Sequence, residues 1–101
     1  MEGQGCETIL VVDDDSFVRR LATVSLQRYG YKVLGSRCGL RGLQCFREYA
    51  EEIQLVVTDV VMPEMSGPEM VDAILRERGD VRVLFITGYG SALPLPPHQE
   101  N

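Results

Sequence analysis

Four carboxylates stand at two points of the sequence where a short apolar run ends. Asp13, Asp14 and Asp15 follow the run TILVV, and Asp59 follows the run IQLVVT. Short runs of this kind, rich in β-branched residues, are typical of strands that are buried on both faces of a parallel sheet. Open parallel sheets bind their ligands at the carboxyl ends of the strands. We therefore expect these carboxylates to lie close together at one edge of a sheet.

Carboxylates gathered in one crevice repel each other, and this repulsion raises the pKa of some of them. A divalent cation removes the repulsion, and Mg²⁺ suits a site with few protein oxygens, several waters and a phosphoryl group. An aspartate in such a site can attack phosphorus and form an acyl phosphate. Thr87, at the end of the later run VRVLFIT, offers a hydroxyl to the phosphate. The alternative is that Asp59 closes a turn and that the Asp13–Asp15 run caps a helix.

Apolar runs and helical patterns alternate along the chain. Strands are predicted at residues 8–12, 31–36, 53–58 and 81–87, and helices at about 16–29, 40–51 and 68–78. The order βαβαβαβ predicts an α/β fold with a parallel sheet, right-handed crossovers and helices on both faces. Gly30 is expected to end the first helix, and Pro68 suits the first turn of the third.

The composition limits the class of protein. A chain of 101 residues with 45% hydrophobic content permits one domain with a modest core. The net charge of −5 gives no basic field for nucleic acid or an anionic membrane. No apolar run reaches the roughly 18 residues of a membrane-spanning helix. Cys6, Cys38 and Cys45 lack metal-ligand spacing, so we expect reduced thiols and a cytoplasmic protein.

The motifs in combination resemble those of the receiver domain of two-component response regulators, of the chemotaxis-regulator type. They are ILVVDDD, LVVTDVVMPEMSG and VLFITGYG, and the resemblance covers residues 8–90. It implies a flavodoxin-like, doubly wound parallel sheet and a role in phosphorelay signalling. The implied partner is a histidine kinase or a histidine phosphotransfer protein. The resemblance implies a signalling domain and no enzyme, with at most self-phosphorylation and autodephosphorylation.

The resemblance also assigns roles to individual residues. Asp59 would be the phosphoacceptor, and Thr87 would be the switch hydroxyl that turns towards the phosphoryl group. Asp13, Asp14 and Asp59 would hold Mg²⁺, with the backbone carbonyl of Val61 as a further ligand. Asp15 has no ligand role in this match.

The chain departs from the family in the number of its elements. The family has five strands in the order 2-1-3-4-5, whereas this pattern predicts a truncated (βα)3β sheet in the order 2-1-3-4. The family's lysine at the end of the fifth strand has no counterpart, because the only lysine, Lys32, begins the second strand. We therefore expect no catalytic lysine in this chain. Residues 1–90 are expected to form the receiver domain, with 1–7 as a flexible lead-in, and 91–101 a proline-rich tail.

The predicted strand order leaves the apolar fourth strand at an edge of the sheet. An uncovered apolar edge invites pairing with another chain. We also expect apolar parts of the first and third strands and of the first helix to be exposed, which marks an interface. The sequence therefore predicts a homodimer.

Two other functions remain open at the level of sequence. The first is a pseudo-receiver that does not switch and acts as a dimerisation or sequestration module. The second is a phosphatase of the haloacid dehalogenase type, in which Asp13 and Asp15 would act together after a buried strand. Phe17 stands where that motif has Thr or Val, which disfavours the phosphatase. A further alternative is that the chain is a fragment of a longer protein.

Overall fold

The computed structural model describes residues 7–86. Its elements are β1 (Thr8–Val12), α1 (Ser16–Gln27), β2 (Lys32–Ser36), α2 (Gly39–Glu48), β3 (Ile53–Asp59), α3 (Gly67–Glu77) and β4 (Arg82–Ile86). The predictions for Cys6, for Thr87 and for the tail at 91–101 lie outside the described residues.

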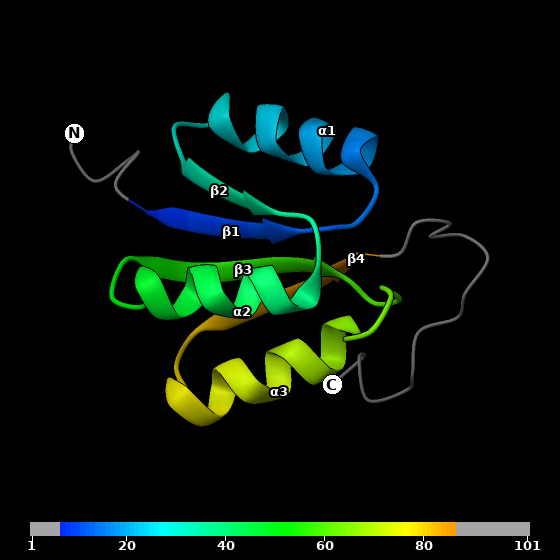
Figure 1. Ribbon diagram of the computed structural model, residues 1–101. Helices are drawn as coiled ribbons and strands as arrows, with labels where there is room; N and C mark the ends of the chain where they lie inside the picture. Colours follow the sequence, from blue (N-terminus) through cyan, green and yellow to red (C-terminus); the bar gives the residue numbers. More distant parts are fainter. Residues whose placement is uncertain (1–6, 87–101) are drawn as a thin grey trace, which may run out of the picture.

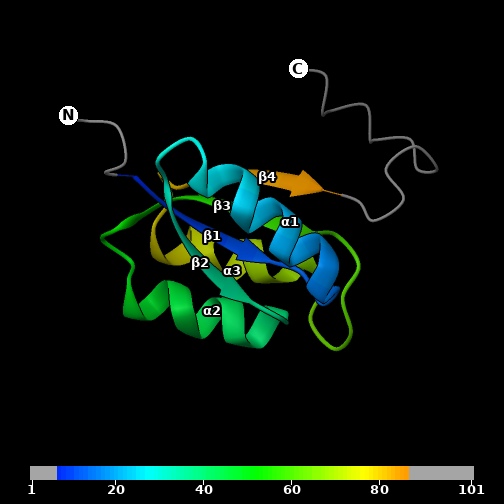
Figure 2. The ribbon, with the colours of Figure 1, turned by 90° about the horizontal axis from the view of Figure 1, so that it is seen from above.

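The strands form one parallel sheet in the order β2-β1-β3-β4. The predicted α/β fold and strand order are thus confirmed. α1 lies on one face of the sheet, and α2 and α3 lie side by side on the other (Figures 1 and 2). All the carboxyl ends of the strands therefore point to the same edge.

The register of the sheet brings the ends of β1 and β3 level with each other. Val12 lies beside Thr58, so the next residues, Asp13 and Asp59, begin the loops at the same edge. The backbone N–H of Asp13 also donates to the carbonyl oxygen of Ser36, at 3.1 Å, which extends the pairing with β2 by one bond. The turn that carries Asp13 is thereby anchored to the sheet.

Most of the core lies between the sheet and the pair of helices α2 and α3. Phe46, Met70 and Ile74 are fully buried there against Leu10 and Val56 of the two central strands. Each helix supplies an apolar stripe that repeats at helical spacing, so both pack flat against the sheet. The larger of the two hydrophobic clusters therefore lies on this face of the sheet.

The other face is covered more thinly. Ile9, Val11 and Val57 are buried beneath α1, with Ala22 and Leu26 packed against them. The prediction that apolar parts of the first strand face water is therefore wrong, because every residue of β1 is buried. α1 contains no fully buried residue.

The prediction of exposed apolar side chains on the first helix is confirmed. Leu21 is 56% exposed, and Leu84 of β4 is 54% exposed. Leu84 pairs with Val57 across the strands, so it lies on the α1 face of the sheet. Among the described residues, β4 pairs with β3 alone.

Capping residues mark where two of the helices begin. Asp15 caps the start of α1, and Ser66 and Glu69 form a reciprocal capping box at the start of α3.

The end of α2 comes earlier than predicted. The helix stops at Glu48 and not at residue 51, because the backbone N–H groups of Glu52 and Ile53 both donate to the carbonyl oxygen of Tyr49. Gly30 follows α1 with φ 92°, a conformation that favours glycine.

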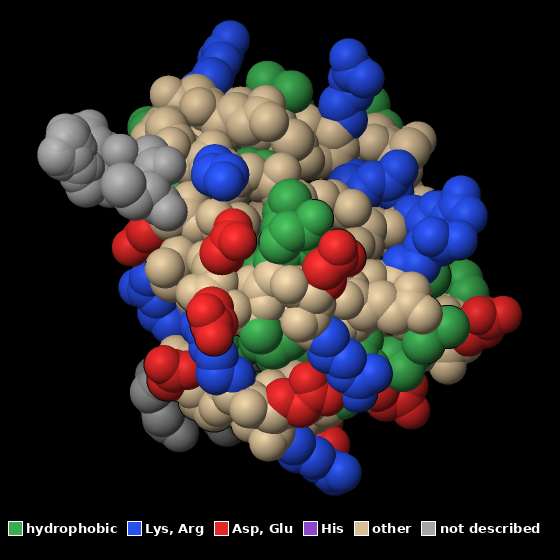
Figure 3. All heavy atoms as spheres, turned by 60° about the vertical axis from the view of Figure 1, so that its left-hand side comes forward, with side chains coloured by type: hydrophobic (Ala, Val, Ile, Leu, Met, Phe, Trp, Pro, Cys, Tyr) green, Lys and Arg blue, Asp and Glu red, His purple; other side chains and the backbone are tan. Residues whose placement is uncertain are grey.

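Figure 3 shows one face of the molecule, on which positive and negative side chains are interspersed around apolar ones. Neither sign of charge prevails on this face. Within residues 7–86, no helix has both the length and the apolar character needed to cross a membrane.

Candidate functional site

Three of the predicted carboxylates come together at the carboxyl edge of the sheet. Asp13, Asp14 and Asp59 each place an oxygen within 4.8 Å of the others. Asp13 is buried, Asp14 is exposed and Asp59, the last residue of β3, is partly buried. The sheet therefore assembles the cluster that the strand ends predicted.

The cluster is electrostatically strained. Burial raises the pKa of Asp13, and the charges of Asp59, Asp14 and Asp15 raise it further. The backbone N–H of Asp15 opposes this shift by donating to Oδ1 of Asp13 at 2.9 Å. The carboxylates are thus held together in spite of their mutual repulsion.

Asp59 shows the same balance of effects. Burial is the main cause of its raised pKa, and the charge of Asp14 adds to it. The backbone N–H of Val60 donates to Oδ1 of Asp59 at 2.8 Å, and this hydrogen bond lowers the pKa. That hydrogen bond also holds one carboxylate oxygen in place at the end of the strand.

Arg19 supports the cluster from α1. Its Nη1 donates to the backbone carbonyl oxygen of Asp13 at 2.7 Å. This residue was missed by sequence reasoning, because an arginine one turn into a helix is common on solvated faces. A basic residue six positions after the first aspartate was the only available signal.

The loop after β3 folds back tightly against Asp59. The N–H of Gly67 donates to the carbonyl oxygen of Val60 at 2.9 Å. A Cβ atom at Gly67 would collide with the carbonyl oxygen of Asp59, so only glycine permits this approach. The hydroxyl of the buried Thr58 donates to the same carbonyl oxygen at 2.9 Å. The side chain of Val61 is exposed, and the ligand role of its carbonyl stays a prediction.

Asp15 serves a different purpose from its two neighbours. Its Oδ1 accepts hydrogen bonds from the N–H groups of Phe17, at 2.9 Å, and Val18, at 3.3 Å. These bonds make it the N-cap of α1, so for Asp15 the alternative interpretation of the acidic run as a helix cap is confirmed. A capping carboxylate is already engaged, and this disfavours the phosphatase reading, which needs Asp15 to act beside Asp13.

The cluster has the donor set that hard cations prefer. Mg²⁺ and Ca²⁺ bind carboxylate oxygens, and Mg²⁺ commonly uses only one or two carboxylates together with waters. Lys32 pairs with Thr8, at the amino end of β1, and so lies at the opposite end of the sheet from Asp59. The predicted hydroxyl of Thr87 follows β4, outside the described residues. The described site therefore supplies oxygen ligands and no lysine.

The comparisons with known proteins agree with this geometry. The family model described as response regulator receiver domain matches residues 9–94. The chain is 36% identical over 85 residues to the sensor kinase CckA of Brucella abortus (strain 2308), a match that covers 84% of this chain and 9% of the kinase. It is 34% identical over 92 residues to the response regulator receiver protein CpdR of the same organism, covering 91% of this chain and 74% of CpdR.

A solved structure shows the same fold. The response regulator TrrA of Thermotoga maritima, in complex with Mg(2+)-BeF, superposes with a TM-score of 0.75 at 32% identity, covering 84% of this chain and 72% of that one. Fold, family model and relatives coincide over nearly the same residues. The chain belongs to the response regulator receiver domain family of two-component signalling.

Proposed function

We propose that this receiver domain accepts a phosphoryl group on Asp59 with the help of Mg²⁺. The observation that carries the proposal is the convergence of Asp13, Asp14 and Asp59, whose oxygens lie within 4.8 Å of one another. Three carboxylates so close together fit a divalent cation, because the cation removes the repulsion that, after burial, adds to the raised pKa of Asp13 and Asp59. The complex named for TrrA, with Mg(2+)-BeF, supports the same assignment.

The cation would supply charge neutralisation for the phosphoryl oxygens. Asp13, Asp14 and Asp59 would hold it, together with the carbonyl oxygen of Val61. The chain's own residues position the reaction: the N–H of Val60 holds Oδ1 of Asp59, which leaves Oδ2 to attack. That oxygen forms the new bond to phosphorus, while the P–N bond of a phosphohistidine donor breaks and the departing imidazole takes up a proton.

The donor is a histidine kinase or a histidine phosphotransfer protein. Receiver domains act with such partners, and the relative CckA is named as a sensor kinase. In the proposal Thr87 supplies the switch hydroxyl, residues 1–90 act as the receiver unit with 91–101 as a tail, and the reaction takes place in the cytoplasm.

A second proposal concerns the assembly. The exposed Leu21, Val24 and Leu84 and the edge of β4 favour a homodimer of this chain. The same features suit the alternative function, a pseudo-receiver that pairs or sequesters partners without switching. The two functions differ in whether Asp59 reacts.

Acetyl phosphate with Mg²⁺ tests the reaction directly. Intact-mass spectrometry is expected to show one added phosphoryl group on the wild type and none on Asp59→Asn. Asp72→Asn is the matched control, because Asp72 is an exposed carboxylate on α3 paired with Arg76; it should react like the wild type. A wild type that gains no phosphoryl group, yet dimerises, would favour the pseudo-receiver.

A further inference from the structure

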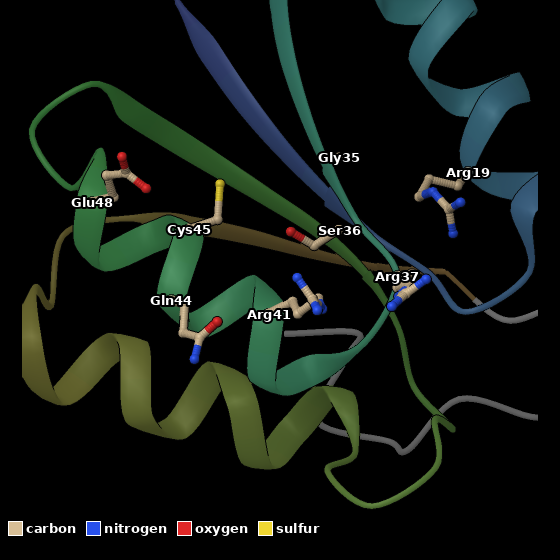
Figure 4. Close-up of a pocket in the computed structure, with 8 residues that line it drawn as sticks. All are labelled: Arg19, Gly35, Ser36, Arg37, Arg41, Gln44, Cys45 and Glu48. Atoms are coloured by element: carbon tan, nitrogen blue, oxygen red, sulfur yellow. The ribbon is translucent and has the colours of Figure 1, made fainter.

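A polar pocket lies between α1, β2 and α2 (Figure 4). Its volume is about 430 Å³, which is within the range of about 300–1,000 Å³ that is typical of small-molecule sites. We call it the arginine pocket, after three of its lining residues, Arg19, Arg37 and Arg41. The phosphoacceptor proposal gives this pocket no ligand, and of its three arginines only Arg19 also contacts the turn of Asp13.

The three guanidinium groups of the arginine pocket are not neutralised by the described part of the chain. Arg47, Arg76, Arg78 and Arg82 each form an ion pair with a carboxylate. Within residues 7–86, no carboxylate lies at ion-pair distance from Arg19, Arg37 or Arg41. Of the five arginines that have no such partner within residues 7–86, three line this one concave site, and their positive charge attracts anions.

The backbone shapes the pocket. Gly35 on the edge strand β2 forms part of the lining, and a Cβ atom at this position would meet the aliphatic part of the Arg19 side chain at 3.7 Å, so glycine leaves room for Arg19 to lie beside the strand. Arg19 is held by its hydrogen bond to the Asp13 carbonyl, and this removes part of the entropy cost of binding an anion. Arg37 follows β2 and Arg41 lies on the first turns of α2, and in Figure 4 Arg37 lies between Arg41 and Arg19.

The opposite end of the pocket has the opposite charge. Glu48 lies at the last turn of α2, with Cys45 between it and the arginines. A carboxylate there accepts hydrogen bonds from an amino group, while the partly buried Cys45 offers an apolar surface. The pocket is therefore suited to a ligand with phosphate groups at one end and an amino-bearing ring at the other.

We propose that the arginine pocket binds a nucleoside diphosphate with an amino-bearing base. Guanidinium groups bind phosphate oxygens through paired, charge-assisted hydrogen bonds. The base would lie along α2 towards Glu48. The proposal does not depend on phosphorylation of Asp59.

Calorimetric titration with ADP in the presence of EDTA tests the proposal, since chelation keeps Mg²⁺-bound nucleotide from the carboxylate cluster. We expect saturable binding by the wild type. Arg37→Gln and Arg41→Gln should each weaken it about tenfold, because each removes a charge-assisted hydrogen bond. Arg28→Gln is the control with the same change of charge, at the far end of α1 and outside the pocket, and it should bind like the wild type.

Two further probes separate the parts of the ligand. Glu48→Gln should weaken ADP and leave inorganic pyrophosphate unchanged, and adenosine should bind far more weakly than ADP. Pyrophosphate binding equal to that of ADP would overturn the nucleoside assignment. The whole proposal is overturned if ADP and pyrophosphate fail to bind, or if the Arg28 variant loses as much affinity as the pocket variants.

Discussion

The guanidinium group of Arg19 donates a hydrogen bond of 2.7 Å to the backbone carbonyl oxygen of Asp13. One side chain of α1 thus anchors the turn that carries the buried carboxylate of the cluster. The same side chain lines the arginine pocket. The two sites therefore share a structural element, although their chemistry is opposite in charge.

Replacing Arg19 with alanine should loosen that turn. We expect Arg19→Ala to lower the free energy of unfolding by about 1–2 kcal/mol, since a charged donor to a buried backbone acceptor is lost. Mg²⁺ affinity should fall about tenfold, as it does when groups that orient ligands are removed. Urea unfolding and Mg²⁺ titration measure the two effects. Arg20→Ala, at the neighbouring exposed position, should change neither, and an equal effect there would contradict the role given to Arg19.

The carboxylate cluster should give a characteristic dependence of stability on pH. Burial raises the pKa of Asp13 and of Asp59 above the usual 3.8. Between that value and the raised pKa, the folded state binds more protons than the unfolded chain. The free energy of unfolding contributed by these groups therefore falls as pH rises through this window and is constant above it.

Urea titrations across mildly acidic to neutral pH, with and without Mg²⁺, check this behaviour. Without Mg²⁺ the wild type should lose stability relative to Asp13→Asn as pH rises, because the asparagine carries no charge. Saturating Mg²⁺ should restore the wild type and leave the variant nearly unchanged. Parallel pH profiles for the two proteins would show that the cluster carries no such strain.

Gly67 should tolerate no side chain. In Gly67→Ala the added Cβ meets the carbonyl oxygen of Asp59, so the loop and the start of α3 must move away from β3. We expect a loss of about 1–3 kcal/mol in the free energy of unfolding, together with slower phosphorylation of Asp59. Gly79→Ala is the control, since its Cβ would lie 3.6 Å from the carbonyl oxygen of Leu75, which is an ordinary contact. Comparable losses in both variants would rule out the collision as the cause.

The dimer proposal predicts that a charge at Leu84 disrupts assembly. Burying a leucine side chain contributes about 1.5–3 kcal/mol, so Leu84→Lys should weaken dimerisation by roughly tenfold or more. Light scattering over a dilution series measures the change. Leu40→Lys makes the same substitution at a similarly exposed leucine on α2 and should leave assembly intact. A wild type that is monomeric at micromolar concentration would end the proposal.

The arrangement of elements was predictable because the pattern of the sequence is strong. Buried strands such as IQLVV leave little choice of face, and the alternation with helices permits few parallel topologies. Asp13 and Asp59 were expected at the same edge of the sheet, because each stands at the carboxyl end of a parallel strand. The acidic run was also expected to offer a helix cap, and Asp15 has this role.

Other features could not be predicted because they depend on contacts between distant residues. Arg19 reaches Asp13 only once α1 has packed on the sheet, and the need for glycine at position 67 appears only when the loop meets Asp59. The prediction that the first strand exposes apolar groups failed for the same reason. Ala22 and Leu26 are small or partly buried residues, and their cover over Ile9 and Val11 depends on how closely α1 approaches.

The thin cover provided by α1 has a consequence for hydrogen exchange. A helix with no fully buried residue gains little free energy from packing, so it is expected to open locally while the layer of α2 and α3 stays closed. Asp15 caps α1 and Arg19 belongs to it, so each opening event also frees the turn of Asp13. Amide protection in α1 would then report, residue by residue, how firmly the acidic turn is held and how much a bound cation adds to it.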